Sequence, residues 1–100
     1  MNAEQALKAA LKLNNKSAVI HNNFGSGYFS QRNFDAAIIE YTQAIKLNSR
    51  YSEAWFNRAL AYYAQGNLVQ ALLNIKETYG LNPVDATTAE LYNKLRSQSR

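Results

Sequence analysis

The apolar residues of this chain recur at spacings of three and four positions, which places them along one side of each of a series of helices. The segment from Phe34 to Ile45 is the clearest example, because its apolar residues form one continuous stripe. No stretch shows the alternation of apolar and polar residues that is typical of a strand. The pattern predicts an all-α protein of about six antiparallel helices, over about 3–13, 18–31, 34–47, 52–65, 68–80 and 86–97.

Polar and small residues mark the ends of these predicted helices, with breaks near 15–17, 32–33, 48–51, 66–67 and 81–85. Ser17, Asn33 and Asn67 can each accept a hydrogen bond from a first helical turn, so all three are predicted to be N-caps. Gly66 follows a helix end, where a positive φ is common. Pro83 stands at the next helix entrance, where its missing N–H is harmless.

The sequence repeats itself with a period of 34 residues. The identical pairs are Asn23 with Asn57, Tyr28 with Tyr62, Gln31 with Gln65, Asn33 with Asn67, Ala37 with Ala71, Leu47 with Leu81 and Asn48 with Asn82. A fixed period of this length is typical of a helical solenoid, in which each unit buries its apolar face against its neighbours. Because a solenoid exposes a long curved surface, the period favours a binding function.

The same register continues into the first 17 residues. One period before Ala44, Lys46, Leu47 and Asn48 stand Ala10, Lys12, Leu13 and Asn14. We therefore expect one domain over 1–100, made of a half repeat (1–17), two repeats (18–51 and 52–85) and a capping helix (86–100). The first helix would cover its stripe of Leu7, Ala10 and Leu11 on one side only, which predicts weak self-association through terminal helices.

Several residues of both repeats follow the spacing W-x2-L-G-x2-Y, then A-x3-F, then P. The matching segments are Trp55-x2-Arg58-Ala59-x2-Tyr62, Ala71-x3-Ile75 and Pro83 in one unit, and Phe24-Gly25-x2-Tyr28 and Ala37-x3-Tyr41 in the other. On these residues the chain resembles the tetratricopeptide repeat family. The departures are His21, Ser49, Arg58, Ala59 and Thr78. We expect the small residues Gly25 and Ala59, facing Ala37 and Ala71, to let helices approach closely.

The resemblance implies a concave groove lined by the first helix of each repeat. The residues that it assigns to peptide binding are Asn22, Asn23, Ser26, Phe29, Glu53, Phe56, Asn57, Leu60 and Tyr63. Asn23 and Asn57 occupy the same slot one period apart, and a side-chain amide can both donate to and accept from a peptide backbone. The resemblance therefore implies a protein-interaction module that binds a peptide or a partner protein, as a scaffold or adaptor does.

The family also has a clamp of lysines, arginine and asparagines that grips a C-terminal carboxylate. Asn57 matches the middle asparagine of this clamp, but the flanking slots hold Asn22 and Ser26 on one side and Thr87 and Leu91 on the other. Without cations in these slots, a carboxylate has little to bind. We therefore predict that the protein is not a co-chaperone of heat-shock proteins.

The net charge of +4 suggests a different function, because a basic face can bind nucleic acid or an acidic partner. Lys8, Lys12 and Lys16 share one face of the first predicted helix. The remaining lysines and arginines are scattered along the chain, so nucleic acid is disfavoured. A basic adaptor that uses its outer surface remains the alternative hypothesis, and steeply salt-dependent binding would favour it.

Candidate catalytic residues are few. The chain has no cysteine and one histidine, His21, in the slot that holds Trp55 one period later, where packing explains it. Gly25-Ser26-Gly27 lacks the strand and the further glycines of a phosphate-binding loop. We expect no catalysis, cofactor, metal or small-molecule substrate; an enzyme could recruit only His21. No signal peptide or long apolar run is present, which predicts a cytoplasmic protein without membrane insertion.

Overall fold

Five α-helices joined by short turns form the chain in the computed structural model, which describes residues 3–82 and 86–98, with side chains at residue 5, 15–82 and 86–98. The helices are α1 (Ala3–Ser30), α2 (Phe34–Leu47), α3 (Ser52–Ala64), α4 (Leu68–Leu81) and α5 (Ala86–Gln98). The predicted all-α class is confirmed, and no strand occurs in this part of the chain.

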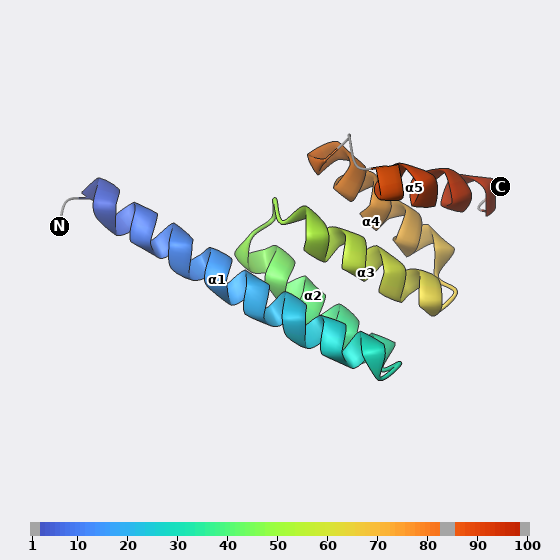
Figure 1. Cartoon of the computed structure of the whole chain (residues 1–100), viewed down its shortest axis with the longest axis horizontal. Coiled ribbons are helices and arrows are strands. Elements are labelled where there is room, and N and C mark those ends of the chain that lie inside the picture. Colours follow the sequence, from blue (N-terminus) through green and yellow to red (C-terminus); the bar gives the residue numbers. More distant parts are fainter. Residues whose placement is uncertain (1–2, 83–85, 99–100) are drawn as a thin grey trace.

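Each helix packs antiparallel on the next one along the chain, as in a solenoid (Figure 1). In this view α1, α3 and α5 lie in the nearer layer, and α2 and α4 lie behind them. The second half of α1 pairs with α2, and α3 pairs with α4, so the two hairpins fall one period apart. The helix α5 packs on α4.

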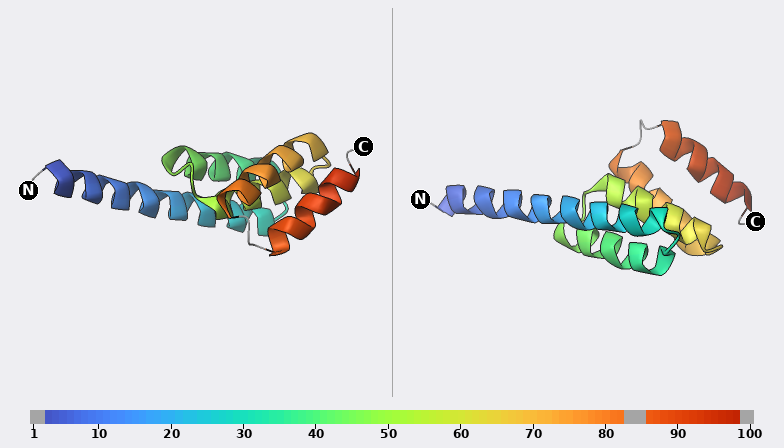
Figure 2. Two further views of the ribbon diagram at one scale, coloured as in Figure 1. Left: turned by 90° about the horizontal axis from the view of Figure 1, so that it is seen from above. Right: turned by 60° about the horizontal axis from the view of Figure 1, so that its bottom comes forward.

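The predicted break near 15–17 is wrong, because α1 continues without interruption from Ala3 to Ser30. Ser17 is therefore not an N-cap. The segment Asn14-Asn15-Lys16-Ser17 contains no proline or glycine, and its polar residues are tolerated inside a helix at small cost. As a result, the first half of α1 projects beyond α2 as a single arm (Figures 1 and 2). The structure does not describe the side chains of the predicted stripe of Leu7, Ala10 and Leu11. Pro83 also lies outside the described residues.

Two of the predicted caps are confirmed. The side chains of Asn33 and Asn67 accept hydrogen bonds from the backbone N–H groups of Ala36 and Gln70, each at 3.3 Å. The residue before each cap has a positive φ, which is 81° at Gly66 and 63° at Arg32. The turns are thus alike in both repeats, although only the second has the glycine that this backbone conformation favours.

Buried alanines hold the helices close together. One cluster joins Ala18 with Ala44 and Ala54, and a second joins Ala37, Tyr41 and Ala61. A third joins Ala59 and Ala71 with Ile75 and Leu95, so the two alanines that were predicted to face each other lie in one buried cluster. At Gly25 the nearest side chain is the ring of Tyr41, whereas the prediction placed Ala37 there.

Candidate functional site

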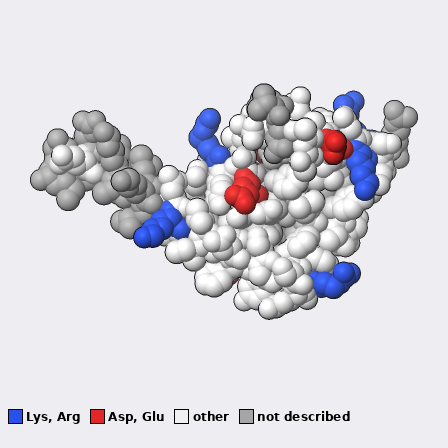
Figure 3. Space-filling model, in the orientation of Figure 1, with Lys and Arg blue, Asp and Glu red and all other residues white. Residues whose placement is uncertain are grey.

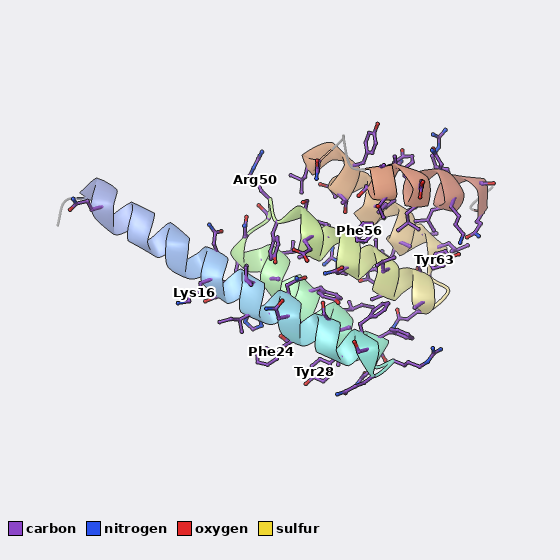
Figure 4. The ribbon with its side chains drawn as sticks, viewed as in Figure 1. Lys16, Phe24, Tyr28, Arg50, Phe56 and Tyr63 are labelled. Carbon is purple, nitrogen blue, oxygen red and sulfur yellow. The ribbon has the colours of Figure 1, made fainter. Side chains whose placement is uncertain are left out.

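Two neighbouring hollows lie along α1, α3 and α5, and Leu60 of α3 lines both of them; we call this surface the groove. The first hollow lies between α1 and α3 and is lined by Ser26, Phe29, Ser30, Tyr41, Asn57 and Leu60. The second lies between α3 and α5 and is lined by Phe56, Leu60, Thr87, Glu90, Leu91 and Lys94. Figure 4 shows Phe56 and Tyr63 on the side of α3 that faces α5.

The position of α3 follows from its own sequence. Ala54 and Ala61 are fully buried in clusters with residues of α2, and Ala59 is fully buried in a cluster with residues of α4. Small residues therefore stand on both of the sides of α3 that pack against neighbouring helices. Phe56 and Leu60, at spacing four, share another side and remain half-buried at the groove. Helix packing therefore presents the groove residues on a rigid element.

An amide chain stands behind the first hollow. The Asn57 Nδ2 group donates to Oδ1 of Asn22 at 3.1 Å, and Nδ2 of Asn22 donates to the Tyr51 hydroxyl at 3.3 Å. Asn22 is 2% exposed, so its amide is used within the protein. Within the described residues, the side-chain oxygen Oδ1 of Asn57 accepts no hydrogen bond. Because Asn57 lines the first hollow, this acceptor is available to the N–H of a ligand.

The floor of the first hollow includes a residue from the second layer. Tyr41 of α2 is 2% exposed, and its hydroxyl lies 3.1 Å from Oγ of Ser26. Burial raises the pKa of this hydroxyl above its ordinary value of 10.0, while the bond to Ser26 opposes that shift. The tyrosine therefore stays neutral near pH 7 and fixes the Ser26 side chain.

The second hollow is apolar at its base and charged at its rim. Phe56, Leu60 and Leu91 supply the apolar surface, and Glu90 and Lys94 are exposed beside it. The Lys94 ammonium lies 5.5 Å from the ring centroid of Tyr63. The Tyr63 hydroxyl accepts a hydrogen bond from Gln98 at 3.5 Å, and this bond is the largest cause of its lowered pKa.

The sequence-predicted residues divide into three groups. Ser26, Phe29, Phe56, Asn57 and Leu60 line the hollows. Asn22 is buried behind them, and Tyr63 lies beside Lys94. Asn23 and Glu53 are exposed and line neither hollow, so the partner of Asn57 is Asn22 and not the equivalent Asn23.

Sequence reasoning missed Tyr41, Glu90 and Lys94 as lining residues. The repeat contained the signal for two of them, since Glu90 and Lys94 fall one period after Phe56 and Leu60. No sequence signal pointed to Tyr41, because it reaches the groove from a second-layer helix through the space beside Gly25.

The hollows have volumes of about 180 and 250 Å³. Sites for small molecules usually enclose about 300–1,000 Å³. Each hollow is therefore the size of one or two side chains, and the pair suits an extended chain better than a compact ligand.

Other kinds of site have little support in the part of the chain that the structure describes. No group of three or more His, Asp and Glu side chains there could hold a metal ion. His21 is engaged by Glu40, with Nδ1 2.7 Å from Oε2. Lys and Arg are spaced around the margin of the face in Figure 3, and the surface between them is mostly white with some acidic side chains, so no basic patch forms there. None of the described helices has the length and apolar character needed to cross a bilayer.

Comparison with known proteins gives a consistent set of relatives. A family model described as TPR repeat matches residues 25–66. U-box domain-containing protein 70 of Oryza sativa subsp. japonica is 26% identical over 81 residues, which are 81% of this chain. The chain spans only 10% of the length of that relative.

Similar solved structures include the first TPR of Spaghetti (RPAP3) bound to the HSP90 peptide SRMEEVD, with a TM-score of 0.78 and 24% identity. The match covers 82% of this chain and 67% of that one. The second TPR domain of human RPAP3, in complex with the HSP70 peptide SGPTIEEVD, has a TM-score of 0.75 and 25% identity over 80% of this chain and 67% of that one. The Arabidopsis OM64 TPR domain has a TM-score of 0.50 and 19% identity, over 84% and 98% of the two chains.

Proposed function

The chain belongs to the tetratricopeptide repeat family, and from this premise we propose that it binds an extended peptide segment of a partner protein in the groove. One observation carries the proposal. Leu60 lines two side-chain-sized hollows, and Asn57, whose Oδ1 accepts no hydrogen bond from the described residues, lines one of them.

An extended peptide fits this arrangement because of its own geometry. Alternate side chains point to the same side and lie about 6–7 Å apart. Two alternate side chains would enter the hollows on either side of Leu60. Between them, a backbone N–H would donate to Oδ1 of Asn57. Binding thus combines apolar burial with a directional backbone contact and needs no cofactor, and we assign the groove no catalytic step.

The hollows also indicate the chemistry of the peptide. The two RPAP3 domains bind heat-shock peptides, which supports a peptide ligand for this fold. Here, however, the slots of the carboxylate clamp hold Asn22, Ser26, Thr87 and Leu91, and Asn22 is buried. The second hollow is mainly apolar, with Glu90 and Lys94 of opposite charge at its rim. We propose that the ligand is an internal segment with apolar or aromatic residues at alternate positions.

The test is an array of immobilised extended peptides that vary alternate apolar residues, net charge and a free or blocked C-terminus. Peptides with two alternate apolar residues should bind, whether or not the C-terminus is blocked. Leu60→Ala and Phe56→Ala should each weaken their binding by about tenfold or more, the loss expected for an anchor side chain.

Leu73→Ala is the matched control, because Leu73 is half-exposed on α4 and lines neither hollow. All three variants should keep the helical circular-dichroism signal. If Leu73→Ala weakens binding as much as Leu60→Ala, or if no array peptide binds, the groove is not the ligand site.

A further inference from the structure

The side of α1 that carries Ile20, Phe24 and Gly27 is uncovered, and we call it the open face. Ile20 is 48% exposed and Phe24 is 59% exposed. Figure 4 shows Phe24 on the side of α1 that points away from α3. Large apolar side chains this exposed, four residues apart on one helix, form a contiguous patch that is unusual on a monomer surface.

One period later the same positions are packed. Ala54, Arg58 and Ala61 of α3 correspond to Ile20, Phe24 and Gly27. Ala54 is fully buried in a cluster with Ala44 of α2, and Ala61 is fully buried in a cluster with Ala37 and Tyr41 of α2.

Arg58 joins the same interface, because its guanidinium donates to the Thr42 hydroxyl of α2 at 3.1 Å. We call α1 and α3, the first helices of their repeats, first-type helices, and α2 and α4 second-type helices. The interface between α2 and α3 shows that this side of a first-type helix is covered by the second-type helix that precedes it along the chain.

A second-type helix does precede the open face in the sequence. Residues 3–14 lie one period before 37–48, which fall in α2 and its C-cap, and Ala10, Lys12, Leu13 and Asn14 are identical to their counterparts. In the structure, however, this segment is the first part of the continuous α1 and extends away from the body (Figure 2). It cannot reach the open face of its own chain, whereas it can reach that of another.

We propose that two copies of this chain pair through antiparallel α1 helices, so that residues 3–14 of each copy cover the open face of the other. The register follows from the interface between α2 and α3. In that interface Ala44 clusters with Ala54, and Ala37 clusters with Ala61. Moving each residue back by one period pairs Ala10 of one copy with Ile20 of the other, and Ala3 with Gly27. The midpoint of both pairs is residue 15. The two-fold axis of the dimer therefore passes near Asn15, an exposed residue.

The first experiment measures mass by light scattering on the full chain over a range of concentrations. The wild type should pass from 11.3 kDa towards twice that mass as concentration rises. Phe24→Asp should remain monomeric, since it places a charge in the open face. Leu73→Asp, at an equally exposed leucine on α4, should dimerise like the wild type. A strict monomer at every concentration, or a dimer that survives Phe24→Asp, overturns the proposal.

The second experiment uses the absence of cysteine in the chain. Under mild oxidation, Asn15→Cys should form an intermolecular disulfide, because equivalent residues meet at a two-fold axis. Arg50→Cys, at another exposed position, should remain reduced. Crosslinking of Arg50→Cys without crosslinking of Asn15→Cys would exclude the antiparallel pairing. Peptide binding is a separate readout, since Phe24 lines neither hollow.

Discussion

The ring of Tyr41 occupies the space in which any side chain at position 25 would begin. A Cβ atom built on Gly25 would lie 2.5 Å from Cε1 of Tyr41 and 2.6 Å from Cδ1. In the second repeat the corresponding residues are Ala59 and Ile75, and both are fully buried. Isoleucine is smaller than tyrosine, and it leaves room for the methyl group of Ala59. The first repeat thus combines glycine with tyrosine, and the second combines alanine with isoleucine.

The first prediction follows from this contact. Gly25→Ala should lower the free energy of unfolding by about 1–3 kcal/mol, because Tyr41 is 2% exposed and has little room to move. Gly27→Ala, two residues away in the same helix and with nothing within 4 Å, should instead raise it by about 0.5–1 kcal/mol. Urea denaturation measures both changes.

A double variant provides the control. Combining Gly25→Ala with Tyr41→Ile reproduces the pair found in the second repeat, so the cost of the combination should be less than the sum of the two single costs. Strict additivity of the two changes would show that the contact between Gly25 and Tyr41 does not determine the stability.

The second prediction concerns the turn after α1. Arg32 has a φ of 63°, a conformation that costs a non-glycine residue about 1–2 kcal/mol. Arg32→Gly should therefore raise the melting temperature, even after the loss of the cation–π contact with Phe34 at 5.8 Å. Gly66→Ala, at the equivalent position with a φ of 81°, should lower it. Equal effects of the two changes, in either direction, would contradict the argument.

The third prediction concerns Arg58, which joins three helices. Its guanidinium donates to Oδ1 of Asn74 at 2.6 Å and to Thr42 at 3.1 Å, and lies 4.8 Å from the Trp55 ring. Desolvation by burial lowers its pKa, although an arginine this basic stays charged near pH 7. Arg58→Ala should cost about 1–3 kcal/mol of stability, because Asn74 is 2% exposed and loses a partner.

The same denaturation measurement tests the geometry of this contact. Arg58→Lys should not restore stability, since an ammonium lacks the planar fork that reaches both partners and stacks on the ring. Arg50→Ala, at an exposed arginine, should stay within about 0.5 kcal/mol of wild type. Full rescue by lysine would mean that charge alone explains the role of Arg58.

The fourth prediction is a loss of stability at alkaline pH. Burial raises the pKa of Tyr41 above 10.0, so the folded protein holds this proton more tightly than the unfolded chain. The contribution of Tyr41 is fully present below about pH 10 and is lost as pH rises through the raised value. Tyr41→Phe should reduce the fall in stability above pH 10, as measured by denaturation at several pH values. A fall as steep in Tyr41→Phe as in wild type would assign it to other groups.

The fifth prediction concerns heat-shock peptides. SRMEEVD and SGPTIEEVD, the peptides bound by the RPAP3 domains, should bind this chain weakly in fluorescence anisotropy. The double change Thr87→Lys with Leu91→Arg places cations in two clamp slots, and it should strengthen binding by about tenfold or more. Blocking the peptide C-terminus should remove the gain. Tight binding to the unmodified protein would contradict the proposed ligand chemistry.

How much could be predicted from the sequence depended on how local the determinants were. The caps at Asn33 and Asn67 were predictable, because each bond joins residues three positions apart. The continuity of α1 was not, since Asn14-Asn15-Lys16-Ser17 has polar residues that suit a turn but no proline or glycine that would end a helix.

The candidate site follows the same rule. The period placed Phe56 and Leu60 at the groove, because one helix face repeats regularly. The inward position of Asn22 depends on hydrogen bonds with Tyr51 and Asn57, which lie 29 and 35 residues away. Contacts of this range cannot be read from spacing along the chain.

The two hollows share a single lining side chain, Leu60, so an extended ligand can fill both only if its two anchoring side chains point to the same face. A ligand that fits has two alternate side chains on the same face, and one of them enters each hollow. Inserting one residue between them leaves the composition of the ligand almost unchanged, yet turns the second side chain to the opposite face. The groove would then select ligands by whether an even or an odd number of peptide bonds separates the two anchoring residues. Partner segments of similar composition could be distinguished by that spacing alone.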